Sequence, residues 1–344
     1  MNELIFLTIF IILIFILIII DTFVFPGKKK IITLKNALIS FIIYFALGIL
    51  FGLILIPFGH NLHNISNINE LKYIIQKNKH LINIENLSFD QALKFYNYNL
   101  FIEYLSGFFL EKILSIDNIF IFYLIFNSLN VSEYNYRKVL IIGILSAIFF
   151  RFIFIFSLTT LIQKFEFVLI ILGLILIFSG YKSFKKDENN KIINNKIINY
   201  IFKKFRFKLD YQGSEFITKE NFKYYFTPLF ASLLLIETTD IIFAIDSVSA
   251  ILSISRDPYI IFFSNIFAIL GLRSLFYFIQ KIINYFKYLK KGISFLLIFI
   301  GLKLVFHEYV HKIGLKPIYS FVIIFFFVLF CILLSIIKKD KKNS

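Results

Sequence analysis

The chain of 344 residues has no tryptophan, one methionine and one cysteine. The single cysteine, Cys331, excludes an intramolecular disulfide, so no disulfide framework holds this fold. Glycine-rich phosphate loops and Ser-His-Asp arrangements are not evident in the sequence. We therefore expect neither an enzyme nor a protein with a bound cofactor.

Long apolar runs dominate what is present. Hydrophobic residues make up 59% of the chain and the mean hydropathy is +0.81. Several runs approach the roughly 20 residues that a membrane-spanning helix needs. The sequence therefore predicts an all-α polytopic membrane protein with about nine transmembrane helices, at 4–25, 36–57, 99–126, 139–162, 166–182, 226–252, 258–279, 292–306 and 318–337.

The basic residues outside these spans are unevenly distributed. One side of the membrane receives 25 Lys and Arg residues and the other receives 8. The positive-inside rule then places the carboxyl terminus in the cytoplasm and the amino terminus outside, in a bacterial inner membrane. The net charge of +16 reflects this bias and attraction to anionic lipid, so the lipid bilayer is an expected partner and nucleic acid is not.

The spans divide the chain into six expected parts. They are a first helix pair at 1–58, an extracytoplasmic loop at 59–98, a first transmembrane repeat at 99–182, a basic cytoplasmic loop at 183–224, a second transmembrane repeat at 225–310, and a last helix with cytoplasmic tail at 311–344.

Five carboxylates interrupt two of the apolar runs, namely Glu111, Asp117, Glu237, Asp240 and Asp246. An ionised side chain facing lipid near the bilayer centre costs roughly 2.5–3.5 kcal/mol. These acids must therefore face the protein interior, and they are the first candidates for a functional site.

The two acidic segments form an internal repeat. Superposing Asp117 on Asp246 also aligns Glu111 with Asp240, because the two acids of each pair are six residues apart. Two further pairs then align, Asn118 with Ser247 and Arg151 with Arg273. The units begin an odd number of crossings apart, so spans 3–5 and 6–8 are predicted to be an inverted repeat, as in many transporters.

Helical geometry separates the acids within each unit. At about 100° per residue, Glu111, Ser115 and Asn118 share one stripe, and Asp117 lies roughly 120° from Glu111. Two explanations stay open. Either the helices break near 115–118 and 244–247, or the second acids pair with arginines. We favour the break, which would also free backbone carbonyls as ligands.

The segments 104–120, 237–258 and 264–273 resemble the signatures of the TerC family of integral membrane proteins, named for tellurium resistance. Further matches are Asp21, Arg137, the stretch 143–151 and the stretch 299–303. The chain departs from the family pattern in its long, Asn-rich segment 58–98 and at Ser249, where we expect proline.

The resemblance implies a member of the lysine-exporter-like superfamily that exports a divalent metal, chiefly Mn²⁺, or acts in tellurite resistance. A different implication comes from plastid members, which are linked to thylakoid biogenesis and suggest a non-transporting partner in membrane protein insertion. The sequence leaves both alternatives open.

The acidic segments offer only oxygen ligands, which suit Mg²⁺, Ca²⁺ or Mn²⁺. The expected metal ligands are Glu111, Asp117, Asn118, Glu237, Asp240, Asp246 and Ser247. Expected gating or charge-pairing residues are Arg151, Arg273 and Lys303. Alternatively, the acids form a purely structural network with these bases and Lys112.

The histidines are all on the predicted outer side, at His60, His63, His80, His307 and His311. A role in metal binding or pH sensing stays open for them. Glu103, near the outer end of its span, is either interfacial or a ligand on an access path.

Overall fold

A computed structural model describes residues 3–24, 32–185, 207–208, 213–220, 222–282 and 289–306, together with a few isolated positions between 309 and 330. The helices are α1 (Glu3–Val24), α2 (Leu34–Phe58), the 3₁₀ helix η1 (Gly59–His63), α3 (Ile68–Lys77), α4 (Phe89–Ser128), α5 (Glu133–Lys164), α6 (Phe167–Lys185), α8 (Pro228–Leu252), α9 (Pro258–Leu270), α10 (Leu272–Ile282) and α11 (Leu289–Val305). The all-α class is confirmed.

Among the described residues, three helices are individually long and apolar enough to cross a membrane, at Leu34–His63, Glu133–Lys164 and Pro228–Leu252. A fourth is the bent pair α9 and α10. The expected ninth span at 318–337 lies mostly outside the described residues.

Local capping explains where several helices begin. Ser88 forms a capping box with Gln91 at the start of α4, so this helix begins ten residues before the predicted span. Thr227 caps α8 and precedes Pro228, which has the backbone geometry of a first helical turn. A short hairpin of β1 (Ile217–Glu220) and β2 (Lys223–Phe226), which the sequence did not predict, precedes α8.

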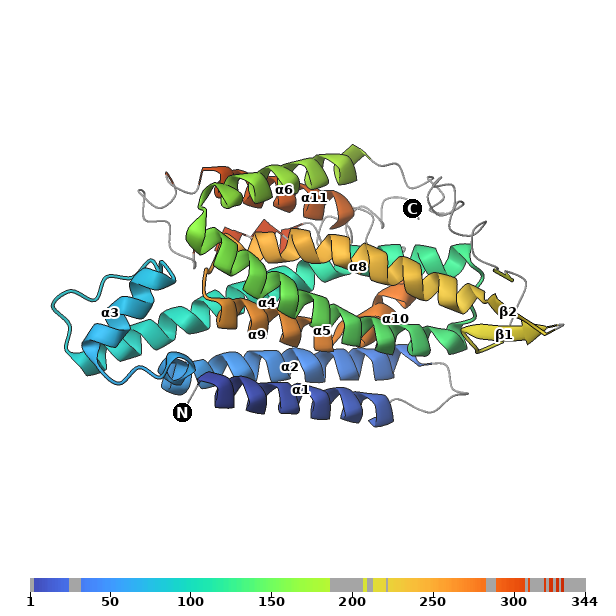
Figure 1. Ribbon diagram of the computed structural model, residues 1–344, viewed down its shortest axis with the longest axis horizontal. Coiled ribbons are helices and arrows are strands. Elements are labelled where there is room, and N and C mark those ends of the chain that lie inside the picture. Colours follow the sequence, from blue (N-terminus) through green and yellow to red (C-terminus); the bar gives the residue numbers. More distant parts are fainter. Residues whose placement is uncertain are drawn as a thin grey trace, which may run out of the picture.

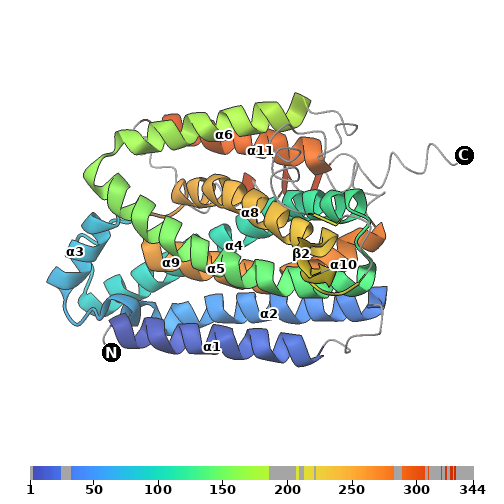
Figure 2. The same ribbon diagram turned by 45° about the vertical axis from the view of Figure 1, so that its right-hand side comes forward.

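The helices form three layers (Figure 1). Helices α1 and α2 cover one side of a central group of α4, α5, α8, α9 and α10, and the pair α6 and α11 covers the other side (Figures 1 and 2). We call the end of the bundle that carries α3 the α3 end. The opposite end carries the β hairpin (Figure 1).

The chain direction fits the predicted inverted repeat. Helix α4 leaves the α3 end while α8 approaches it, and α5 and the α9–α10 pair are likewise opposed (Figure 1). The first helix of each unit contacts the second helix of the other unit, since α4 contacts α9 and α8 contacts α5. The third helices of the two units, α6 and α11, contact each other. Each helix of the first unit thus has its expected counterpart in the second.

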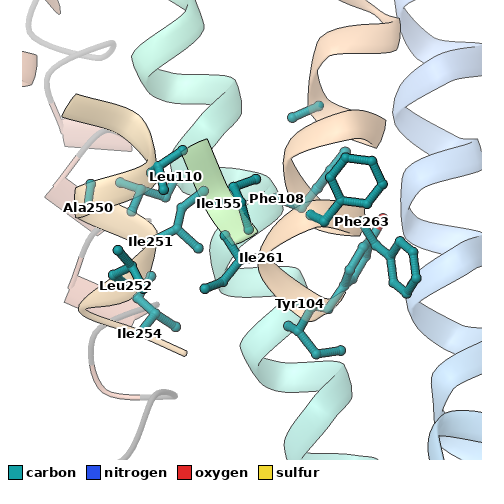
Figure 3. Packing of buried hydrophobic residues seen from close by; sticks show 14 of the residues in the cluster. Tyr104, Phe108, Leu110, Ile155, Ala250, Ile251, Leu252, Ile254, Ile261 and Phe263 are labelled. Atoms are coloured by element: carbon teal, nitrogen blue, oxygen red, sulfur yellow. The ribbon is translucent and has the colours of Figure 1, made fainter. Parts of the chain in front are cut away.

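Apolar side chains fill the central group near the α3 end. Tyr104, Phe108 and Leu110 of α4 are buried, as is the run Ala250–Leu252 of α8. Figure 3 shows Leu110, Ile251 and Ile261 in the space between α4, α8 and α9. A second apolar cluster lies toward the hairpin end and includes Phe126, Tyr136 and Phe276.

One predicted span is not a single straight helix. Helices α9 and α10 meet at Gly271 with a bend of 45°. Lys112 Nζ donates to the Ala268 carbonyl oxygen at 2.7 Å. This is one of the last four carbonyls of α9, which have no partner within their own helix, so the buried lysine satisfies a group at the bend.

Glycines bring α6 and α11 into close contact. A Cβ at Gly173 would lie 2.7 Å from the Gly301 carbonyl oxygen, and a Cβ at Gly301 would lie 2.6 Å from the Gly173 carbonyl oxygen. Small residues commonly allow such backbone approach between membrane helices.

Replacing Gly173 or Gly301 by alanine should therefore destabilise the fold by about 1–3 kcal/mol, because the new methyl group meets a backbone oxygen. Gly143→Ala is the matched control, since its nearest contact would be an ordinary 3.7 Å. Thermal unfolding of the purified protein in detergent measures the difference. Equal unfolding temperatures for all three variants would contradict the close contact.

Candidate functional site

Arg151 of α5 lies where the two units of the repeat meet. Its Nη1 atom is 2.6 Å from Glu111 Oε1, and both side chains are fully buried. The same nitrogen donates to Ser247 Oγ at 3.0 Å and to Asn265 Oδ1 at 2.6 Å. One guanidinium therefore joins α4, α5, α8 and α9.

Helical periodicity places these groups together. Glu111, Ser115 and Asn118 are all buried on one stripe of α4, and Ser115 Oγ donates to Glu111 Oε1 at 3.3 Å. Asp240 and Ser247 are buried on the matching stripe of α8. The two polar stripes predicted from the sequence thus both face the interior.

Two more carboxylates lie near this pair. Asp240 interacts electrostatically with both Arg151 and Glu111. It lines a cavity of about 10 Å³ together with Gly143 and Leu272, at the lower limit for one water molecule. Glu237, half-buried, lies about one turn before Asp240 on α8 and interacts with Ser146 of α5 and with Asp240.

Several buried polar atoms at the site have no hydrogen-bond partner among the described residues. They are the acceptors Glu111 Oε2 and Glu237 Oε1 and the donors Asn118 Nδ2, Arg151 Nε and Arg151 Nη2. An unsatisfied buried polar atom costs about 1–3 kcal/mol. The two carboxylate oxygens have spare capacity to accept a proton or ligate a cation, and Arg151 has spare capacity to donate.

The second acids do not join this cluster through a helix break. Helices α4 and α8 are continuous through 115–118 and 244–247, so the break that we favoured is wrong. Ser249 keeps the backbone N–H that a proline would lack, and its hydroxyl also donates to the Ile245 carbonyl oxygen at 2.5 Å. Unbroken geometry keeps the two acids of each unit roughly 120° apart.

Asp246 accordingly faces another helix. It is half-buried and accepts a hydrogen bond from Ser179 of α6 at 3.2 Å. The side chain of Asp117 lies outside the described residues, as does Asp21, so their predicted roles are not tested.

The remaining predicted bases occupy separate positions. Arg273 is fully buried in the first turn of α10. Lys303 of α11 donates to the Ser253 carbonyl oxygen at the end of α8, at 2.6 Å. Such a contact satisfies a terminal carbonyl and suits the negative end of the helix dipole. Neither residue shares the Glu111–Arg151 contact.

Sequence reasoning missed two groups. Asn265 was not a predicted site residue, although it aligns with Gly143 in the repeat and bonds to Arg151. A second cluster surrounds Glu103 at the α3 end, where this acid is 2% exposed and bonded to His80. Glu103 is therefore a buried member of this cluster.

Among the residues that the structure describes, no three His, Cys, Asp or Glu side chains lie close enough together to hold a metal ion. The geometry around Arg151 explains this at the central site, because the guanidinium occupies the position between its oxygen partners. Binding of a cation there would require Arg151 to move.

The fold and the buried charges define an all-α integral membrane protein with a polar centre. The chain belongs to the integral membrane protein TerC family, whose model matches residues 96–343. The matched region contains the whole central site.

Relatives extend the similarity beyond that region. An uncharacterised membrane protein of Rickettsia prowazekii is 36% identical over 325 residues, covering 94% of this chain and 96% of the relative. A membrane protein of Rickettsia felis is 42% identical and covers 69% of this chain and 78% of the relative. A Salmonella typhi protein named "Putative membrane-bound redox modulator Alx" is 35% identical, over 60% of this chain and 65% of that protein. No solved structure shows significant similarity to the chain.

Removing one member of the central ion pair should destabilise the protein strongly. Glu111→Gln or Arg151→Gln leaves the other charge buried without its partner, at a cost of about 3–5 kcal/mol. The double variant should lose less than the sum of the two single losses, because it leaves neither charge. Thermal unfolding of the three variants in detergent tests this, and strictly additive losses would show that the two side chains do not interact.

Proposed function

We propose that this protein exports a divalent metal cation, with Mn²⁺ as the expected substrate, by alternating access at the site around Glu111 and Arg151. The observation that supports this proposal most is the fully buried Glu111–Arg151 contact at the junction of two inverted units. Inverted repeats of this kind commonly enclose a substrate site near the middle of the bilayer.

In the structure, Arg151 supplies the positive charge that the buried acids require. A buried carboxylate without a counter-charge is costly, so either an arginine or a cation must accompany Glu111 and Asp240. Displacing Arg151 would free oxygens from Glu111, Ser247 and Asn265 at one place. These are the hard ligands that Mn²⁺ accepts.

Apolar side chains close the site from both ends. Phe108 and Ile251 belong to the cluster toward the α3 end, and Phe126 and Phe276 belong to the cluster toward the hairpin end. An ion can reach Asp240 only if one of these clusters separates. Relative movement of the two repeat units would open them in turn, as alternating access requires.

Neutralising the carboxylates should abolish export because the amide keeps the shape of the side chain and loses the charge that attracts the cation. We expect cells that express Asp240→Asn or Glu237→Gln, at the two carboxylates near the Glu111–Arg151 pair, to accumulate Mn²⁺ to the level of cells without the protein. Elemental analysis of washed cells after a Mn²⁺ load measures this.

Glu220→Gln is a matched control, since Glu220 is an exposed carboxylate of the hairpin that pairs with Lys208. It should keep export intact, and membrane levels of every variant must be equal. Mn²⁺ contents in the Asp240 and Glu237 variants equal to those of cells with the wild-type protein would reject the carboxylate site. Equal contents with and without the wild-type protein would favour the non-transporting membrane partner.

A further inference from the structure

A second buried charged cluster lies at the α3 end. His80, in the segment between α3 and α4, contacts Glu103 of α4 through its Nδ1 and the Oε1 atom at 2.8 Å. Both side chains are almost fully buried, and the edge of the His80 ring meets Tyr96. A buried carboxylate here needs a proton or a counter-charge.

Asp257 forms the other half of this cluster. Its Oδ2 atom lies 2.7 Å from His63 Nε2 and 3.8 Å from His80 Nε2. His80 therefore lies between two carboxylates, and His63 faces one of them. The same Asp257 caps α9, where its Oδ1 atom accepts from the Tyr259 backbone N–H at 2.9 Å.

The residues between α8 and α9 are held by side chains from several elements. Ser255 Oγ donates to Glu103 Oε2 at 2.5 Å, and Lys303 donates to the Ser253 carbonyl oxygen. Arg256 lies 3.4 Å from Glu166, which follows α5. The α8–α9 turn, residues 253–257, thus joins η1, α4, α11 and the α5–α6 connection.

Helix capping alone does not account for the histidines. The Asp257 carboxylate already accepts the backbone N–H of Tyr259, and the hydroxyl of Ser255 accepts the Asp257 N–H at 3.2 Å. The two imidazoles are additional partners, and they are the side chains whose charge changes near neutral pH.

We propose that His63, His80, Glu103 and Asp257 form a proton-binding site that holds the α8–α9 turn against η1 and α4 when protonated and releases it when the protons leave. The proton comes from hydronium on the α3 side, and binding converts a neutral imidazole to imidazolium. The inference deepens the proposed function, on which its link to transport rests, because it identifies the proton as the ion that controls access from the α3 end.

The charges in the two states explain the release. With both imidazoles protonated, two positive charges balance Glu103 and Asp257. With both neutral, two carboxylates remain in a buried space with only hydrogen bonds to stabilise them. Moving the α8–α9 turn outward would let water solvate them, and the apolar cluster around Ile251 and Ile261 moves with that turn.

The pKa directions agree with this sequence. Burial by itself lowers the pKa of His80, but Glu103, its hydrogen bond and Asp257 outweigh burial and raise it above the ordinary 6.5. Burial raises the pKa of Asp257, but His63 and His80 outweigh it and lower the value below the ordinary 3.8. The raised His80 pKa contributes stability below about 6.5 that is lost as pH rises through the folded-state value.

The opposite sign applies to Asp257, whose contribution is present above 3.8 and is lost as pH falls through its lowered value. The closed α3 end is therefore most stable at weakly acidic pH. Alkaline pH should open it.

Thiol labelling of the full-length protein in proteoliposomes tests the site. A Cys331→Ser background receives Ser106→Cys, a position that is 1% exposed and lies one turn inside Glu103. A membrane-impermeant maleimide is applied from the α3 side at about pH 6 and about pH 8, which lie on either side of the ordinary pKa of histidine. The labelling rate of the Ser106→Cys protein is divided by the labelling rate of Tyr73→Cys, an exposed α3 position, to correct for the ionisation of the thiol.

We expect the ratio to be several-fold higher at about pH 8 than at about pH 6, because the imidazoles lose their protons as the pH rises. His80→Gln removes the cation and should label fast at both values. Glu103→Gln removes the acid that needs the cation and should label slowly at both. A merely structural contact would make the two variants change in the same direction.

His60→Gln is the matched control, because His60 contacts Asn97 and lies outside the cluster; it should keep the pH response. The same response in His80→Gln as in the parent would overturn the proposal. The experiment measures thiol labelling and does not depend on Mn²⁺. A wild-type protein that failed to export Mn²⁺ from cells would therefore contradict the proposed function without contradicting the proton site.

Discussion

The buried contact between Glu111 and Arg151 is the constraint on which the rest of this structure depends. Two full charges lie among membrane-spanning helices, and their desolvation is repaid only when good geometry and further hydrogen bonds accompany the pair. Ser247 and Asn265 supply those bonds from the second repeat unit. Helices α4, α5, α8 and α9 must therefore meet at one level, and the inverted repeat achieves this with one polar stripe from each unit.

The same helix carries one acid of each buried polar cluster. Glu103 and Glu111 are eight residues apart on the continuous α4, which separates them by about 12 Å along its axis. Tyr104, Phe108 and Leu110 lie between them and are buried. An apolar layer thus insulates the central site from the cluster at the α3 end. Because α4 is continuous through both levels, its backbone links the two clusters directly.

Helical periodicity, the spacing of the repeat and the free-energy cost of a charge in lipid predicted three features of the structure. They are the interior polar stripes, the opposed direction of the two units and the charge pairing of Arg151. Sequence reasoning failed where tertiary contacts decide. It favoured a helix break near Asp246, but helical hydrogen bonds are kept there and the acid turns to Ser179 of α6 instead. It also could not assign Glu103 and His80, because 23 residues separate them and only the folded loop between α3 and α4 brings them together.

One difference between the two repeat units has an identifiable origin. Gly271, at the bend between α9 and α10, aligns with Phe149 in the continuous α5, and Lys112 aligns with Ile241. A Cβ at Gly271 would lie 2.7 Å from Lys112 Nζ, so a larger residue there would displace the end of the lysine side chain. Its ammonium group then satisfies the Ala268 carbonyl at the end of α9. In the first unit, Ile241 takes the place of the lysine and α5 continues without a break, so Arg151 lies within a continuous helix. Arg273 instead lies directly after the bend, in the first turn of α10. Two arginines that the repeat makes equivalent in sequence therefore lie in different local structures, and only Arg151 lies within a helix that is continuous on both sides of it.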